Sequence, residues 1–215
     1  MQYAHRAAGI AAAAAMAMVW ATGATAATGQ QVFATCAACH GARGEGNPAT
    51  GAPAIAGQQL AYLQRQLGNF RTGLRGTHKD DKYGAQMRAG AQAVLQDDKA
   101  TAAVAAYVAS LPVTSIKPAV KFDARNGNNL YQGKCGACHG VRAEGNPALF
   151  APRLAGLDAA YIKRQVDNFK HGVRGAQAQD KYGRQMALMA ATVTTERELD
   201  DVIGYIHSNG VAVKP

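Results

Sequence analysis

Two five-residue stretches carry the residues with the clearest chemistry in this chain. Residues 36–40 read CAACH and residues 135–139 read CGACH. Two cysteines separated by two residues and followed at once by histidine form the spacing of c-type haem attachment, in which each thiol adds to one haem vinyl group and the histidine reaches the iron. Residues three apart share one face of a helical turn, so the two sulfurs can straddle one porphyrin edge. The pattern predicts two covalently attached c-type haems, with these residues as their anchors and iron ligands: Cys36, Cys39 and His40, and Cys135, Cys138 and His139.

Three other uses of cysteine pairs fit these residues less well. A thioredoxin-like redox pair shares the spacing, but it follows a strand, and no strand is expected before either motif. A four-cysteine zinc site would have to join two pairs across nearly half of the chain. A disulfide within either motif would close too few residues to restrain the unfolded chain. Since all four cysteines of the chain lie in the two motifs, haem attachment accounts for every one of them.

The chain is an internal duplication. One offset of 99 residues relates the two halves: it pairs Cys36 with Cys135, Pro53 with Pro152, Tyr62 with Tyr161, Arg75 with Arg174, and Met87 with Met186. The stretch 112–122 holds two prolines and two lysines and is typical of an extended linker. We therefore expect two domains, at 28–111 and 123–215. Each is small for a domain that must bury its own core, and a haem would supply much of the missing apolar mass.

Residues 1–26 have the pattern of a signal peptide. A short charged beginning with Arg6 precedes residues 9–20, which are almost all Ala, Met and Val, and Ala24-Thr25-Ala26 is a small-residue cleavage site. The apolar run is too short to span a bilayer. The alternative is a leader retained as an anchor. Export fits the predicted cofactor, because thioether-linked haem is assembled outside the bacterial cytoplasm, and it predicts a periplasmic protein.

The secondary structure is predicted to be helical throughout, which makes the fold class all-α. Six helices are expected, at 30–39, 58–70 and 97–110 in the first half and at 127–138, 157–169 and 195–208 in the second. Thr195 and Glu198 have the spacing of a capping box. Gly29 stands one residue nearer to its cysteine than Gly127 does, so the first opening helix is expected to pack differently against Tyr107. No stretch alternates with period two for long enough to predict a sheet.

The sixth iron ligand decides between an electron carrier and an enzyme. Met87 and Met186 occupy equivalent positions downstream of the two motifs, and a methionine kept in both copies is hard to explain as core filler. Met189 is the competing ligand in the second half. Histidine and methionine together raise the reduction potential and leave no coordination position for a substrate.

His78 and His171 lack a counterpart in the repeat, and we interpret them as surface residues.

Two further pairs of residues are expected to support the haem sites. Pro53 and Pro152 each lie 13 residues after their motif histidine, and a carbonyl at or beside them is the candidate acceptor for the second ring nitrogen. The alternative is a proline that only shapes a loop. Arg75 and Arg174 are the candidate donors to the anionic haem propionates. The alternative for these arginines is a solvated basic face.

These features together resemble the di-haem cytochromes c4. The resemblance rests on the two motifs, on YLQRQLGNFRTGLR at 62–75, on the later methionine and on AAYVASL at 105–111, and it covers essentially the whole mature chain. It implies two class I cytochrome c folds related by a pseudo-twofold axis, with haem edges close enough for electron exchange. It also implies a periplasmic relay of electrons toward a terminal oxidase. The segments 77–86 and 176–185 are longer than the family pattern leads us to expect.

The formal net charge of +9 bears on partners rather than on fold. A modest positive field speeds encounter with an acidic redox protein or with an anionic membrane surface. No nucleic-acid partner is expected, because the basic residues form no continuous run. The leading interpretation is a monomeric electron carrier between a respiratory donor and a terminal oxidase. The alternatives are the haem subunit of a periplasmic dehydrogenase and a di-haem peroxidase, which would need one open iron.

Overall fold

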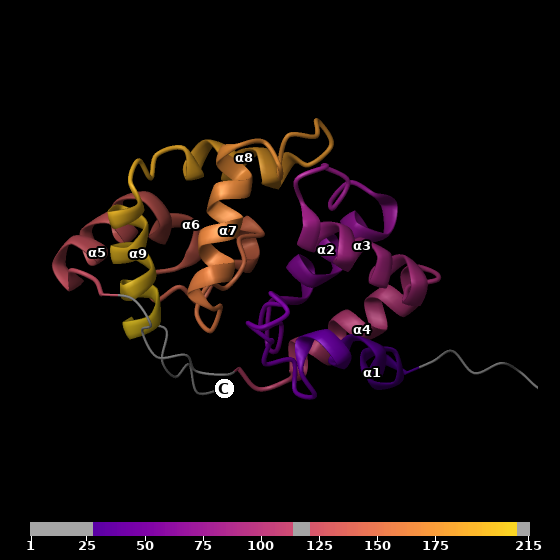
Figure 1. Cartoon of the computed structure of the whole chain (residues 1–215). Coiled ribbons are helices and arrows are strands. Elements are labelled where there is room, and N and C mark those ends of the chain that lie inside the picture. Colours follow the sequence, from indigo (N-terminus) through magenta and orange to yellow (C-terminus); the bar gives the residue numbers. More distant parts are fainter. Residues whose placement is uncertain (1–27, 114–120, 210–215) are drawn as a thin grey trace, which may run out of the picture.

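The computed structural model describes residues 28–113 and 121–209, which form two helical domains beside each other (Figure 1). The predicted signal peptide and most of the predicted linker lie outside the described residues. Within the described ranges the chain forms no strand, and its β-type pairing is limited to two isolated bridges, Asn47 with Ala52 and Asn146 with Ala151. The all-α fold class is therefore confirmed. In the same ranges, no helix combines the length and the apolar character needed to cross a membrane.

The helices of the two domains follow one another in the same order. The first domain contains α1 (Gly29–His40), α2 (Leu60–Thr72), α3 (Lys82–Val94) and α4 (Asp98–Ser110). The second contains α5 (Ala124–Tyr131), the π-helical turn η1 (Gln132–Gly136), α6 (Ala137–His139), the 3-10 turn η2 (Pro147–Leu149), α7 (Ala159–Lys170), α8 (Lys181–Ala190) and α9 (Glu196–Asn209). The six predicted helical regions all form, whereas the sequence patterns did not predict α3 and α8.

The two additional helices explain why the segments before the methionines are long. Asp81 caps α3 by accepting a hydrogen bond from Gly84 N at 2.9 Å, and Asp180 caps α8 through Gly183 N at the same distance. Both aspartates are buried. An aspartate at this position satisfies one of the free N–H groups at a helix start. The long segments therefore contain a capped helical turn, and they carry Met87 and Met186 on helices.

The first and last helices of each domain cross closely at a glycine. A Cβ at Gly29 would overlap with Ala103 O, and one at Gly127 would overlap with Asp201 O. One aromatic pair lies at each crossing, with ring centroids 5.3 Å apart for Phe33 and Tyr107 and 5.0 Å apart for Tyr131 and Tyr205. The helix pairs α1 with α4 and α5 with α9 thus pack alike, and the prediction of a different packing against Tyr107 is wrong.

The extra residue of the second half is absorbed within the helix instead. After Tyr131 the helical ladder widens into the π-turn η1 (Gln132–Gly136), which includes the first two residues of the second motif, before α6 begins. A single inserted residue in a helix is commonly accommodated in this way, and π-turns often occur at functional sites. The π-turn preserves the helix crossing on one side and the motif on the other.

The crossing glycines generate a prediction about stability. We expect Gly127→Ala to lower the free energy of unfolding by about 1–3 kcal/mol, because the backbones of α5 and α9 would have to separate. Gly90 on α3 faces open space, so Gly90→Ala is the matched control and should stabilise the helix by about 0.5–1 kcal/mol. Denaturant unfolding followed by circular dichroism measures both. Equal effects of the two substitutions would contradict the close crossing.

The start of α9 generates a prediction about pH. Glu198 N donates to Thr195 Oγ1 at 3.1 Å, as half of a capping box requires, but the Glu198 carboxylate accepts from Thr194 N at 2.7 Å rather than from Thr195 N. This backbone bond and the Thr194 hydroxyl lower the pKa of Glu198 to about 2. A lowered carboxyl pKa stabilises the folded state above the unfolded value, 4.5, and this contribution disappears as the pH falls toward about 2.

Glu198→Gln should therefore flatten the dependence of stability on pH between about 4.5 and 2 while leaving the protein folded at neutral pH. Unfolding midpoints of the wild type and the variant across this range provide the measurement. Parallel curves for the two proteins would show that the Glu198 carboxylate is not held as described.

Candidate functional site

The motif residues lie at the ends of the opening helices. Cys36, Cys39 and His40 occupy the last turns of α1, and the second motif occupies η1 and α6. The first cysteine of each motif is half-buried and the second is exposed, and no disulfide joins any of the four. Gly41 and Gly140 end the helices with φ angles of 81° and 79°, a conformation that favours glycine. Each motif thus has its second cysteine at the domain surface, while its first cysteine packs against the core and its histidine is buried.

The motif histidines are buried and held by backbone carbonyls. His40 and His139 are 6% and 7% exposed. His40 Nδ1 lies 2.9 Å from Pro53 O, and His139 Nδ1 lies 2.8 Å from Pro152 O. The predicted carbonyl acceptors at the two prolines are therefore confirmed.

The surroundings fix the protonation of these rings. Burial lowers the pKa of both histidines, so the imidazoles are neutral. With the proton on Nδ1 and donated to the carbonyl, the lone pair of Nε2 is available to a metal. The two histidines have the geometry and tautomer that an axial iron ligand requires.

A tight loop brings each proline to its histidine. Gly46 N donates to His40 O and Gly145 N donates to His139 O, both at 2.7 Å. A Cβ at Gly46 would overlap with the backbone that follows Pro53, so only glycine allows this approach. The isolated bridges Asn47–Ala52 and Asn146–Ala151 close the loops just before the prolines. The position of each carbonyl is therefore built into the backbone.

The methionines lie on α3 and α8 and face the domain cores. Met87 packs against the same core cluster as Cys36, and Met186 packs against the same cluster as Cys135. The competing Met189 is 42% exposed. Each domain thus directs one motif cysteine and one methionine toward a common apolar interior.

The first thiol of each motif differs from that of a redox-active pair. Burial raises the pKa of Cys36 and raises that of Cys135 to about 11. A thioredoxin-like pair depends instead on a lowered pKa that generates thiolate. Among residues 28–113 and 121–209, no three His, Cys, Asp or Glu side chains converge as a metal-binding group. The donors fit thioether attachment of a porphyrin better than either alternative.

The two domains meet in contacts that occur in related pairs. Arg65 Nη2 donates to Phe150 O at 2.8 Å, and its repeat counterpart Arg164 donates to Gly51 O at 2.6 Å. The Arg65 guanidinium lies 4.4 Å from the ring centroid of Tyr182, and that of Arg164 lies 4.1 Å from that of Tyr83. Because Arg65, Gly51 and Tyr83 stand 99 residues before their counterparts, the contact has pseudo-twofold symmetry.

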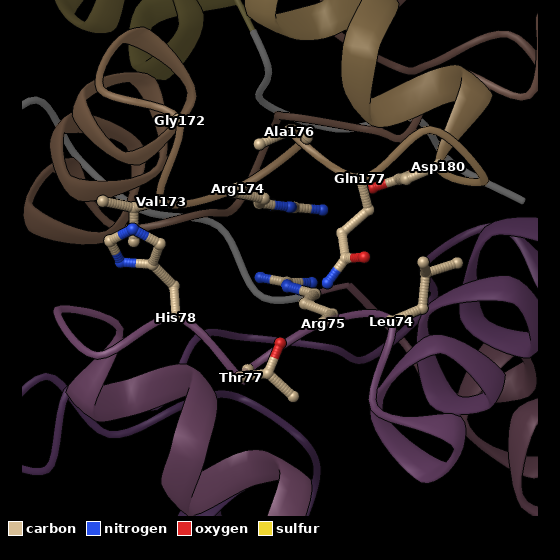
Figure 2. A pocket seen from close by; sticks show the side chains of 12 residues that line it. Leu74, Arg75, Thr77, His78, Gly172, Val173, Arg174, Ala176, Gln177 and Asp180 are labelled. Atoms are coloured by element: carbon tan, nitrogen blue, oxygen red, sulfur yellow. The ribbon is translucent and has the colours of Figure 1, made fainter.

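A closed ring of hydrogen bonds lies at the centre of this contact. Arg75 donates to Gln66 Oε1 at 2.8 Å and to Gln165 Oε1 at 2.9 Å, and Arg174 donates to Gln165 Oε1 at 2.7 Å and to Gln66 Oε1 at 2.9 Å. Both arginines extend into a pocket of about 320 Å³ between the loops 74–78 and 172–177 (Figure 2). Sequence reasoning missed both glutamines, although they too are 99 residues apart.

The guanidinium groups at this contact have no acidic partner within the described ranges. None of Arg65, Arg75, Arg164 and Arg174 forms an ion pair there, and the Nε atom of each is buried without a hydrogen bond. Arg174 is only 8% exposed. Buried charges are costly unless they are paired. Four such cations suit the four propionates that two haems would bring, so the residues present fit this cofactor.

The pKa of Tyr62 reflects the positive electrostatic potential at the contact between the domains. Burial alone would raise the pKa of Tyr62, yet the charges of Arg174, Arg75 and Arg65 hold it below its ordinary value. Arg174 also donates to the Tyr62 hydroxyl at 3.2 Å. The contact therefore attracts negative charge.

The two unmatched histidines lie outside this chemistry. His78 is exposed on the rim of the pocket, opposite Val173 (Figure 2). His171 is exposed at the end of α7, with Nδ1 3.0 Å from Asp167 O. Their positions agree with the interpretation of surface residues.

Known proteins share this architecture. The protein family described as Cytochrome c matches residues 26–112 and 124–210. Cytochrome c4 of Azotobacter vinelandii is 31% identical over 181 residues, which cover 75% of this chain and 80% of the relative. The thiosulfate dehydrogenase electron acceptor of Thiomonas intermedia is 36% identical over 169 residues, covering 74% of this chain and 73% of the relative.

A solved structure supports the same relationship. The reduced recombinant cytochrome c4 from Pseudomonas stutzeri superposes with a TM-score of 0.65 at 27% identity, over 83% of this chain and 95% of that one. The family match covers both halves of the chain, and the sequence and structural similarities extend over most of its length. This chain belongs to the cytochrome c4 family, and it is a di-haem c-type cytochrome that carries electrons.

Proposed function

We propose that this chain is an exported one-electron carrier that takes electrons from a respiratory donor and delivers them toward a terminal oxidase. Two observations made in each domain carry the proposal: the motif histidine is buried and bonded to a proline carbonyl, and the first motif cysteine packs against the same apolar core as a partly buried methionine. Two axial ligands of this kind favour reversible electron transfer over substrate binding.

The proposed ligand sets follow the repeat. In the first domain Cys36 and Cys39 would hold the porphyrin through thioether bonds, and His40 and Met87 would bind its iron. In the second domain Cys135, Cys138, His139 and Met186 would do the same. Bound haem supplies a reversible ferric–ferrous couple. The protein's part is to orient the histidines through Pro53 O and Pro152 O, to offer a thioether from α3 or α8, and to enclose both in apolar side chains.

Arg75 and Arg174 are the proposed propionate donors. Their guanidinium groups are half-buried to buried, they meet across the domain contact, and no described carboxylate pairs with them. An arginine can donate two parallel hydrogen bonds to a carboxylate, which adds orientation to charge neutralisation. This role would place the carboxylate edges of both cofactors at the contact between the domains.

The proposed location and partners rest on charge, on the leader and on relatives. Residues 1–26 have the composition of a signal peptide, and cytochromes c4 are similar over most of the chain. The net charge of +9 favours encounter with an acidic redox partner or an anionic membrane surface. We therefore propose a periplasmic, monomeric carrier that exchanges electrons with other redox proteins.

Two relatives support a second candidate function. Two of the similar proteins are described as electron acceptors of thiosulfate dehydrogenase, so this chain is alternatively the haem partner of a periplasmic dehydrogenase. Purification from its native host separates the two functions. A free chain that is oxidised by membrane fractions supports the carrier, whereas a stoichiometric catalytic partner supports the dehydrogenase subunit.

The methionine assignment predicts the outcome of substitution. Met87→Ala and Met186→Ala should each lower the reduction potential of one haem and allow it to bind cyanide or carbon monoxide, because one axial position becomes free. Met189→Ala, three residues from Met186 on the same helix, is the matched control and should change neither property. A redox titration with ligand-binding spectra checks all three. Wild-type behaviour of Met87→Ala or Met186→Ala would refute the assignment.

The propionate assignment makes a separate prediction. Arg75→Met and Arg174→Met should each lower a haem potential, since loss of a nearby positive charge favours the ferric state over the more negative ferrous one. Arg125→Met is the control, because Arg125 is exposed at the start of α5. Redox titration at low ionic strength is the measurement. Potentials equal to the wild type in both buried-arginine variants would favour a purely structural hydrogen-bond ring.

A further inference from the structure

Two consecutive glutamines of the first domain hold the loop that orients the histidine of the second. Gln58 is 5% exposed. Its Nε2 donates to Arg153 O at 2.9 Å, and its Oε1 accepts from Arg153 N at 2.9 Å. Both backbone groups of the residue that follows Pro152 are thus fixed by one side chain from the other domain.

Gln59 holds the residue on the other side of the same proline. In the amide orientation that satisfies both groups, its nitrogen donates to Ala151 O at 2.9 Å and its oxygen accepts from Asn146 N at 3.0 Å. Arg153 adds a return bond, from Nη2 to Ala56 O at 2.6 Å. Pro152 is therefore bracketed by contacts from the first domain, and its own carbonyl accepts from His139 Nδ1 at 2.8 Å.

The arrangement has no counterpart around Pro53. The repeat puts Leu157 and Asp158 in the places of Gln58 and Gln59, and Ala54 in the place of Arg153. A leucine side chain forms no hydrogen bond, and the Asp158 carboxylate instead caps α7 through Tyr161 N. This part of the contact breaks the pseudo-twofold symmetry. Each histidine loop receives one arginine bond from the other domain, Arg164 to Gly51 O or Arg65 to Phe150 O, but only the loop of the second domain is also held by glutamines on both sides of its proline.

We propose that Gln58 and Gln59 are positioning residues for the axial histidine of the C-terminal haem, so that the first domain sets part of the second haem's potential. The inference rests on the proposed role of His139 as iron ligand. A firm bond from Nδ1–H to a carbonyl raises the basicity of a metal-bound histidine, and a more basic ligand favours ferric iron. Release of the Pro152 loop should weaken that bond, raise the potential of the C-terminal haem and leave the N-terminal haem unchanged.

The test variant is Gln58→Leu in the full-length holoprotein, which removes both hydrogen bonds while keeping side-chain volume. Gln58→Glu is the second variant, because it keeps the acceptor for Arg153 N but loses the donor to Arg153 O. It replaces Gln58→Leu in the test if that variant fails to fold. The matched control is Gln92→Leu, because Gln92 lies in the same domain on α3 and bonds Arg71 O instead. Each protein is first shown to carry two haems.

Two measurements distinguish a specific effect on the position of His139 from a general loosening of the contact between the domains. The first is exchange of the ring N–H protons of His40 and His139, resolved by paramagnetic NMR of the ferric protein. We expect His139 N–H exchange to accelerate about two- to tenfold in Gln58→Leu, the range for one weakened hydrogen bond, and His40 exchange to stay constant. The second is the pair of haem potentials, with the ferric-to-ferrous ratio of the C-terminal haem changing by up to about tenfold, or about 59 mV for a one-electron couple.

Each result bears on the proposal. A change confined to the C-terminal haem and His139, absent from Gln92→Leu, supports it. Unchanged exchange and potentials overturn it, as do equal changes at both haems, which would indicate a loosened domain contact. Failure of the proposed function is distinguishable, because wild-type protein would then lack the spectrum of histidine–methionine ligation at the second haem.

Discussion

The hydrogen bond from each motif histidine to a proline carbonyl is the interaction on which the rest of this structure depends. It fixes the ring, its tautomer and the direction of Nε2. The glycine that ends the motif helix, the tight loop closed by Gly46 or Gly145, and the isolated bridge before each proline all serve to bring that carbonyl into place. The methionine helices α3 and α8 then offer a thioether from the same apolar core. Their arrangement suits a cofactor that changes charge with little movement of the protein.

The internal duplication is the second feature that determines how this molecule is built. Because the two halves meet through equivalent surfaces, a contact made by one half is repeated by the other. The arginine–tyrosine stacks and the arginine–glutamine ring are examples. The concentration of half-buried to buried guanidinium groups, whose Nε atoms have no hydrogen-bond partner, gives the contact a positive charge that suits carboxylates of the cofactor. Departures from symmetry are then informative. The π-turn η1 absorbs an inserted residue without moving the helix crossing, and the Gln58–Gln59 contacts link one domain to the histidine loop of the other.

Much of this could be predicted from the sequence, because haem attachment imposes strict spacing. The motifs, the repeat, the all-α class and the carbonyl acceptors at Pro53 and Pro152 all follow from short local patterns. The helices α3 and α8 were missed because each has a glycine in its first turn, Gly84 or Gly183, and glycine is a weak helix former that is more typical of loops. The partners of Arg75 were missed for a different reason. A ring formed between residues 9 and 90 positions apart depends on how two domains dock, which no local pattern specifies. Arg75 and Arg174 as propionate donors and Met87 and Met186 as ligands stay predictions.

The central claim is that every molecule carries two low-spin haems, each bound by one histidine and one methionine. Magnetic circular dichroism of the ferric wild-type protein, quantified against a pyridine haemochrome count on the same sample, tests it most directly. The account predicts two haems per chain and a near-infrared charge-transfer band of methionine-bound iron with the intensity of both. A five-coordinate signal, a band typical of two nitrogen ligands, or fewer than two haems per chain would contradict it.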